Sequence, residues 1–177
     1  MMPIIRAYQK LLTKYPLPVQ AAQAGTLMAL GDHIAQKAVS KKNYNELDWT
    51  RTSQFATIGC LLTGPATIIW YRILNKYVGS KGGTVALKKV TFDQIVFAPI
   101  FLIVLLSTIH TLQGKNLGEF KTKLKEEYYE ILQNNYKIWP FVQLANFYFV
   151  PLHYQALVVQ MVALLWNVYI TYRTNIH

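Results

Sequence analysis

The chain has 177 residues and a formal net charge of +10, with 53% hydrophobic and only 15% charged residues. That composition is too apolar for a typical soluble surface, and the length suits one compact bundle but not a transporter built from repeats. The positive charge does not indicate nucleic-acid binding, because Lys and Arg lie in short clusters between apolar segments, as residues flanking membrane spans do.

The first fifteen residues predict a basic amphipathic helix at about 3–15. Arg6, Lys10 and Lys14 recur every fourth residue, and no acidic residue occurs before Asp32. Such a helix suits the surface of an anionic membrane, and it also resembles mitochondrial targeting segments, which are basic, amphipathic and poor in acids. A juxtamembrane helix without a targeting role explains the pattern equally well.

Two membrane crossings are predicted next, at about 18–38 and 52–73. The first is the less hydrophobic, and Asp32 and Gln36 continue a stripe of small residues along one of its faces. Small residues let a second helix approach closely in a bilayer. A carboxylate on that stripe should point into the bundle or a wet cavity, because exposing it to lipid is costly.

A third crossing, predicted at about 90–112, opens with Asp93 and Gln94. Asp93 is expected near the depth of Arg72, at the end of the preceding crossing, and we expect these two residues to form an ion pair. Asp32 should lie roughly 14 Å away in depth, at 1.5 Å per residue, so a catalytic pair of carboxylates is not expected.

The longest stretch without Lys, Arg, Asp or Glu covers residues 138–172. It exceeds the about 20 apolar residues that one crossing requires, and Pro140 and Pro151 divide it. We therefore predict a short embedded segment at 139–149 and a fourth crossing at about 152–172.

Residues 118–135, with apolar positions on one face, predict a second amphipathic surface helix. The sequence thus predicts an all-α membrane protein, in which residues 1–177 form a single bundle with four transmembrane helices, two surface helices and one embedded segment. Four crossings put both termini on one side. Each side then carries nine Lys or Arg residues, so the orientation stays open.

Little in the sequence indicates catalytic chemistry, and an enzyme is not expected. Neither a nucleophile elbow nor a zinc-binding helix motif occurs, and the histidines lack metal-ligand spacing, so we expect no metal or cofactor. Cys60, the single cysteine, is expected to be an inert packed thiol, with a redox-sensing role as the alternative.

Proline positions predict bends, because a proline ring removes a helix hydrogen bond and clashes with the preceding turn. These candidate kink or gating positions are Gly64, Pro65, Pro99 and Pro151. Pore-lining or buried polar roles are predicted for Asp32, Gln36, Asp93 and Gln94. Charge pairing or a place at the mouths is predicted for Arg51, Arg72, Lys88 and Lys89.

Several short motifs, spread over nearly the whole chain, resemble one family of membrane proteins. They include Leu30-Gly31-Asp32, Gly64-Pro65, Trp70-Tyr71, Asp93-Gln94, Trp139-Pro140, Gln143, Asn146-Phe147, Val150-Pro151 and Trp166-Asn167. Together they resemble the family of Mpv-seventeen and the twenty-two-kilodalton peroxisomal membrane protein. The resemblance implies a small protein that crosses the mitochondrial inner membrane several times, with the peroxisomal membrane as the alternative location.

The same resemblance implies a weakly selective channel for small solutes. Such a channel supports control of membrane potential and reactive oxygen species, and supplies deoxynucleotides for mitochondrial DNA maintenance. In this interpretation Asp32 lines the path, and Asp32→Asn is expected to change ion selectivity. A non-conducting scaffold of an inner-membrane complex is the alternative. The expected partners are the lipid bilayer, further copies of the chain or an inner-membrane complex, and small solutes or nucleotides, but not nucleic acid.

Overall fold

The computed structural model describes residues 2–39, 43–114 and 117–175, and within them the chain forms helices and turns without any β-strand. This confirms the all-α prediction. The α-helices are α1 (Met2–Lys14), α2 (Pro16–Ile34), α3 (Trp49–Ile58), α4 (Gly64–Tyr77), α5 (Gly83–Phe92), α6 (Ala98–Leu112), α7 (Leu117–Phe149) and α8 (Leu152–Asn175). Three π turns, η1 (Ala35–Val39), η3 (Gly59–Thr63) and η4 (Asp93–Phe97), and one short 3₁₀ turn, η2 (Tyr44–Glu46), complete the described elements.

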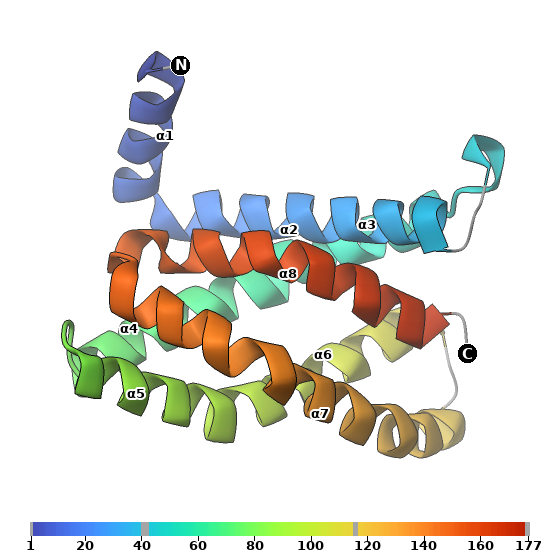
Figure 1. The fold of residues 1–177 in the computed structure, drawn as a ribbon. Helices are drawn as coiled ribbons and strands as arrows, with labels where there is room; N and C mark the ends of the chain where they lie inside the picture. Colours follow the sequence, from blue (N-terminus) through green and yellow to red (C-terminus); the bar gives the residue numbers. More distant parts are fainter. Residues whose placement is uncertain (1, 40–42, 115–116, 176–177) are drawn as a thin grey trace.

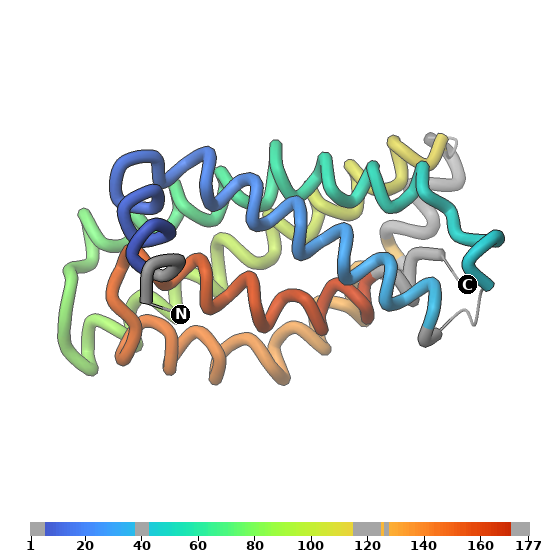
Figure 2. Tube along the Cα trace, turned by 90° about the horizontal axis from the view of Figure 1, so that it is seen from above, coloured from blue at the N-terminus to red at the C-terminus, as the bar shows by residue number. Residues whose placement is uncertain are grey.

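The long helices run side by side in one bundle, and α1 projects away from the bundle at the end where α2 begins (Figure 1). Seen from above, α2 lies beside α8, and these two helices are in contact (Figure 2). The chain passes along the bundle in α2, in α3–α4, in α5–α6, in α7 and finally in α8. As a result α1 lies at one end of the bundle and α8 terminates at the other, whereas four crossings predicted both termini on one side of the membrane.

The extra pass is α7, a single helix of 33 residues where we predicted a surface helix at 118–135 and an embedded segment at 139–149. Pro140 lies inside this helix, although an interior proline costs about 3 kcal/mol. A buried stripe explains the continuity: Asn135, Trp139, Gln143 and Phe147 recur every fourth residue and are all buried. Tertiary packing on both sides of the proline therefore outweighs its local cost.

The predicted bends at Gly64-Pro65 and Pro99 each fall directly after a π turn. The Gly64 N–H donates to the Gly59 carbonyl, and the Ala98 N–H donates to the Asp93 carbonyl, in both cases five residues back. This wider turn makes room for the proline ring that follows it. Pro151 lies between α7 and α8, where the chain reverses direction.

Among the residues that the structure describes, two continuous helical segments are long and apolar enough to cross a membrane: Trp49–Tyr77, of 29 residues, and Gly83–Leu112, of 30 residues. They contain the crossings predicted at 52–73 and 90–112. The crossings predicted at 18–38 and 152–172 correspond to the helical segment α2–η1 and to α8.

Large apolar side chains cover much of the outside of the bundle. Leu61 is 76% exposed and Leu165 is 74% exposed, and both lie in long helices. Further exposed apolar side chains on these and the other long helical segments are Ile69, Ile95, Ile100, Phe141, Phe149 and Met161. Such a surface is unfavourable in water and suits contact with lipid.

The stripe of small residues on α2 packs inside the chain, against η3 and the start of α4. A Cβ atom added to Gly59 would lie 2.6 Å from the carbonyl oxygen of Ala24 and 2.6 Å from the Cα of Gly25. A Cβ atom added to Gly64 would lie 2.8 Å from the Cα of Ala21. The glycines therefore let two helix backbones touch, as small residues do in membrane bundles.

Candidate functional site

The carboxylate of Asp93 lies in the middle of the bundle and is held by neutral donors. Its exposed fraction is 2%. Trp70 Nε1 donates to Oδ1 at 2.9 Å, and Gln94 Nε2 and Gln143 Nε2 donate to Oδ2 at 2.8 and 3.0 Å. These donors come from α4, η4 and α7, so the carboxylate ties three helical segments together.

The predicted ion pair between Asp93 and Arg72 is wrong. Arg72 follows Trp70 by two residues, which on an α-helix turns its side chain roughly 200° away from the side that faces the carboxylate. Instead, the Arg72 side chain lines a cavity at the end of the bundle. The estimate of depth along the helices correctly selected α4 as the helix that supplies a partner for Asp93. It did not show which face of α4 is turned toward Asp93.

A hydrogen-bond network extends from Asp93 through Gln143. Gln143 Nε2 lies 2.8 Å from the Tyr71 hydroxyl oxygen, and Asn146 Nδ2 donates to Gln143 Oε1 at 3.2 Å. On the other side Asn135 Nδ2 donates to Gln94 Oε1 at 3.3 Å. Because these side chains are buried, their mutual hydrogen bonds replace those that water would supply.

The network borders a central cavity of about 100 Å³. Polar lining residues are Thr63, Thr67, Tyr71, Asp93, Gln94, Asn135, Gln143 and Asn167. The aromatic side chains of Trp139 and Trp166 lie on its wall and pack edge to face, with ring centroids 6.1 Å apart. The cavity thus combines apolar walls with amide, hydroxyl and carboxylate groups, as binding cavities in proteins commonly do.

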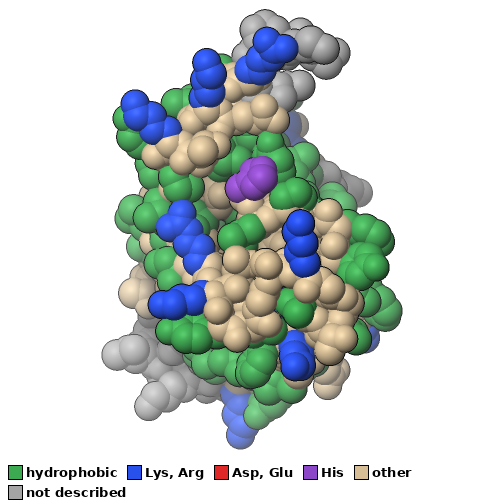
Figure 3. All heavy atoms as spheres, turned by 90° about the vertical axis from the view of Figure 1, so that its left-hand side faces the viewer, with side chains coloured by type: hydrophobic (Ala, Val, Ile, Leu, Met, Phe, Trp, Pro, Cys, Tyr) green, Lys and Arg blue, Asp and Glu red, His purple; other side chains and the backbone are tan. Residues whose placement is uncertain are grey.

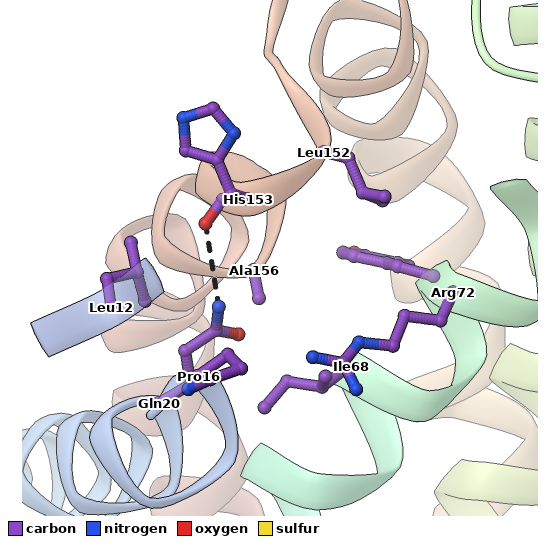
Figure 4. A pocket seen from close by; sticks show the side chains of 9 residues that line it. Leu12, Pro16, Gln20, Ile68, Arg72, Leu152, His153 and Ala156 are labelled. Carbon is purple, nitrogen blue, oxygen red and sulfur yellow. Dashed lines mark hydrogen bonds between the residues drawn. The ribbon is translucent and has the colours of Figure 1, made fainter. Parts of the chain in front are cut away.

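A second cavity, which we call the end cavity, opens at the end of the bundle where α1 joins α2. It has a volume of about 190 Å³ and is lined by Leu12, Pro16, Gln20, Ile68, Tyr71, Arg72, Leu152, His153 and Ala156 (Figure 4). Tyr71 lines the central cavity as well. The ring of Tyr71 therefore separates the polar interior from a cavity that reaches the surface.

The surface around the end cavity is strongly basic. Figure 3 shows this end of the molecule with Lys and Arg side chains spread over it and no Asp or Glu in view. The elements that meet here carry the exposed cations Arg6, Lys10, Lys14, Arg72, Lys76, Lys81 and Lys88. Neither α1, α4, α5 nor the turn before α8 contains an acidic residue, so the charge is not compensated locally and attracts anions.

Asp32 and Gln36 lie away from both cavities, in a polar cluster that joins α2–η1 to the start of α3. Arg51 Nε lies 2.9 Å from Asp32 Oδ1, and Thr52 Oγ1 donates to Asp32 Oδ2 at 2.6 Å. Gln36 Nε2 donates to Asp32 Oδ2 at 2.8 Å, and Gln36 Oε1 accepts from the Asp48 N–H at 2.7 Å. Both Asp32 and Gln36 are 0% exposed. Of the two buried aspartates Asp32 and Asp93, Asp93 is accordingly the one that faces the central cavity.

Lys89 does not lie at a mouth, although charge pairing or a place at a mouth was predicted for it. Its exposed fraction is 1%, its Nζ donates to Asn75 Oδ1 at 3.3 Å, and Nζ lies 5.8 Å from the ring centroid of Phe147. Lys88, its neighbour, points outward and is exposed. Cys60 is half-buried against Gly25, where an added Cβ atom would overlap the sulfur.

Sequence reasoning missed Tyr71, Gln143 and Gln20 as candidate site residues. A signal was present, because the stretch 138–172 lacks charge yet contains Gln143, Asn146, Gln155, Gln160 and Asn167. All five are buried. Amide side chains in an apolar helix should face a polar interior, and that rule would have found Gln143.

The fold and site define a class: a helical membrane protein with an apolar outer surface and a hydrogen-bonded polar interior that contains a buried carboxylate. The chain belongs to the Mpv17 / PMP22 family, whose model matches residues 110–171. It is 41% identical to the mitochondrial inner membrane protein Mpv17 of Homo sapiens over 174 residues, which cover 98% of this chain and 99% of the relative.

Other relatives carry the same description. The mitochondrial inner membrane protein Mpv17 of Danio rerio is 41% identical over 170 residues, 96% of both chains. That of Caenorhabditis elegans is 35% identical over 174 residues, which cover 98% of this chain and 94% of the relative. No solved structure shows a significant match. Near full-length similarity to these proteins places this chain in the mitochondrial inner membrane, as the sequence motifs predicted.

Proposed function

We propose that this protein is a weakly selective channel that conducts small solutes across the mitochondrial inner membrane. The observation that carries the proposal is the position of Tyr71, which lines both the end cavity and the central cavity. A solute that enters at the basic end meets this ring before it reaches the amide and carboxylate groups inside. Tyr71 therefore acts as the gate.

The hydrogen bonds of Tyr71 support this role. Its hydroxyl is held by Gln143, whose amide also donates to Asp93. Movement of the ring therefore requires breaking a hydrogen bond to the group that holds the buried carboxylate. Such a contact allows two arrangements, closed when the bond is made and open when the ring has turned.

We further propose that α2, α7 and α8 cross the membrane together with the two more apolar segments. The four crossings predicted from sequence then become five, because α7 runs the length of the bundle beside the others. Support comes from the outward side chains of α7 and α8, such as Phe141, 73% exposed, and Leu165, 74% exposed. The amide side chains Gln143, Asn146, Gln155, Gln160 and Asn167 of these helices are buried in the bundle instead.

The proposed channel takes part in membrane-potential and reactive-oxygen homeostasis, and in the deoxynucleotide supply for mitochondrial DNA maintenance. These roles rest on the family resemblance. A central cavity of about 100 Å³ is narrow, so larger solutes require a wider open state or several copies of the chain. No catalytic role is proposed.

Release of trapped small solutes from liposomes that contain the purified protein tests the channel. Tyr71→Ala removes the gate and should speed release relative to the wild type, and Tyr71→Phe should do so less. Tyr77→Ala is the matched control, because Tyr77 lies on the same helix, is 75% exposed and lines neither cavity. Tight liposomes with wild type and Tyr71→Ala alike, both shown to be folded, would refute the proposal.

Selectivity gives a second readout. Asp93→Asn removes a negative charge that faces the central cavity, so the reversal potential in reconstituted bilayers should shift toward anions. Asp32→Asn removes a carboxylate that lies outside both cavities and should leave the reversal potential unchanged. If only Asp32→Asn shifted the reversal potential, the conduction path would run past the polar cluster between α2 and α3 and not through the central cavity.

One feature of the structure speaks against the alternative proposal, a non-conducting scaffold. Its small-residue stripes were candidate surfaces for partner proteins, but Gly25, Gly59 and Gly64 are used for packing within the chain. Tight liposomes together with native-mass evidence for a stable hetero-complex would favour the scaffold.

A further inference from the structure

We infer that the end cavity is a binding site for a small organic acid that carries a hydroxyl or amino group beside its carboxylate. The inference deepens the proposed function, because it assigns a ligand class to the entrance of the channel. Binding is measurable without conduction, so the two can fail separately.

The carboxylate is assigned to Arg72. This guanidinium is drawn pointing into the end cavity, toward Gln20 and Ile68 (Figure 4). Among the residues that the structure describes, none forms an ion pair or hydrogen bond with it. Arginine binds carboxylates through two parallel hydrogen bonds, and the surrounding surface offers no competing acid.

The ends of two helices add to the positive potential at the same place. Pro16 is the first residue of α2, Leu152 is the first residue of α8, and both line the end cavity. The N-terminal end of a helix carries a partial positive charge of about half an elementary charge. Two such ends lie next to Arg72 and favour an anion there, and the C-terminal ends of α1 and α7 directly before them offset part of this potential.

The hydroxyl or amino group is assigned to Gln20. This side chain is only 4% exposed, and its Nε2 donates to the His153 carbonyl at 3.5 Å. Its Oε1 is buried and has no donor among the described residues, although buried acceptors are nearly always paired. Figure 4 shows this oxygen on the side of the cavity toward Arg72. A ligand with a hydrogen-bond donor close to its carboxylate satisfies both groups at once.

The volume and the apolar walls of the end cavity determine the size of the ligand's carbon chain. Leu12, Ile68, Leu152 and Ala156 give it apolar walls, which suit a short carbon chain rather than an inorganic anion. Its volume of about 190 Å³ lies below the about 300–1,000 Å³ of pockets for drug-sized ligands. The site therefore suits an acid of a few carbon atoms, and is too small for a nucleotide.

Three probes of matched size separate these contributions: 3-hydroxybutyrate has both groups, butyrate lacks the hydroxyl, and 1,3-butanediol lacks the charge. Binding to the full chain in detergent is measured by saturation-transfer NMR titration. We expect 3-hydroxybutyrate to bind at least about tenfold more tightly than either of the other two, since each of them lacks one of its two polar contacts. Equal affinity for the three probes, or no binding of 3-hydroxybutyrate, would overturn the inference.

Variants locate the site. Arg72→Gln should weaken binding of 3-hydroxybutyrate at least about tenfold, and Gln20→Leu should abolish the preference over butyrate. Lys76→Gln, one helical turn from Arg72, makes the same change of charge outside the cavity and should have little effect. If Lys76→Gln weakens binding as much as Arg72→Gln, general attraction to the basic surface explains the result and the site is refuted.

Thermal melting confirms that each variant is folded, and the comparison of probes on the wild type decides the question if Gln20→Leu does not fold. Binding without solute release from liposomes would refute the channel but keep the site. Release without binding of 3-hydroxybutyrate would refute the site but keep the channel.

Discussion

Replacing Gly59 by alanine should destabilise the bundle, because this position is where α2 and η3 touch. The added Cβ atom would lie 2.6 Å from Ala24 O and Gly25 Cα, whereas ordinary contact begins at 3.4 Å. The obstacles are backbone atoms, so the helices must separate by roughly 0.8 Å, the difference between these two distances. A gap of that size removes a quarter to a half of the attraction between facing atoms.

The expected cost is about 1–3 kcal/mol, the range for overpacking a close-packed interior. For a chain of this length that lowers the melting temperature by about 2–4 °C per kcal/mol. Thermal unfolding in detergent, followed by tryptophan fluorescence, measures the shift. Gly83→Ala is the matched control, because its Cβ atom would lie 3.7 Å from the nearest heavy atom, Tyr148 Cε2. That variant should melt at or slightly above the wild-type temperature, since alanine favours helix. Equal melting of Gly59→Ala and the wild type would refute the tight seam.

Three further outcomes follow from packing and buried polarity, each measured by the same melting experiment. Arg51→Met leaves the Asp32 carboxylate buried without its cation and should cost about 3–5 kcal/mol, of which adding Asp32→Asn should recover part; additive losses would contradict the ion pair. Leu106→Ala, at a side chain with 0% exposure, should cost about 2–5 kcal/mol, while Leu61→Ala, at 76% exposure, should cost little; the reverse order would contradict an outward-facing Leu61. Gln143→Leu removes a donor shared by two buried oxygens and should cost about 1–3 kcal/mol, so a stabilised variant would show that the network is dispensable.

Sequence alone predicted the helical segments well, because the local signals for them are strong. Pro16 lies at the start of α2, and Pro151 separates α7 from α8. The error at Pro140 came from treating a local cost as decisive. Residues 135, 139, 143 and 147 repeat every fourth position across that proline, and this periodicity, read over a longer window, predicts one helix.

The candidate site was harder to predict, because its geometry depends on the direction of side chains around each helix axis. Depth along the membrane follows from residue number, and it correctly kept Asp32 and Asp93 apart. The direction of a side chain around the helix axis does not follow from residue number in this way. For that reason we predicted Arg72 as the partner of Asp93, whereas Trp70 contacts it. The partners of Asp32 also depend on how the loop before α3 returns to α2, and residue spacing carries no information about that path.

The π turns have a consequence for how this chain tolerates insertions and deletions. Each π turn contains one residue more than an α-helix needs over the same rise. The wider turn accommodates its additional residue locally, so deleting one residue within Gly59–Thr63 would leave a regular helix whose two parts keep nearly their present alignment. The seam at Gly59 and the ring of Tyr71 belong to these two parts. Loss of a codon between the turn and Tyr71 has no such compensation: it would rotate Tyr71 by about 100° relative to the seam and aim it at different neighbours.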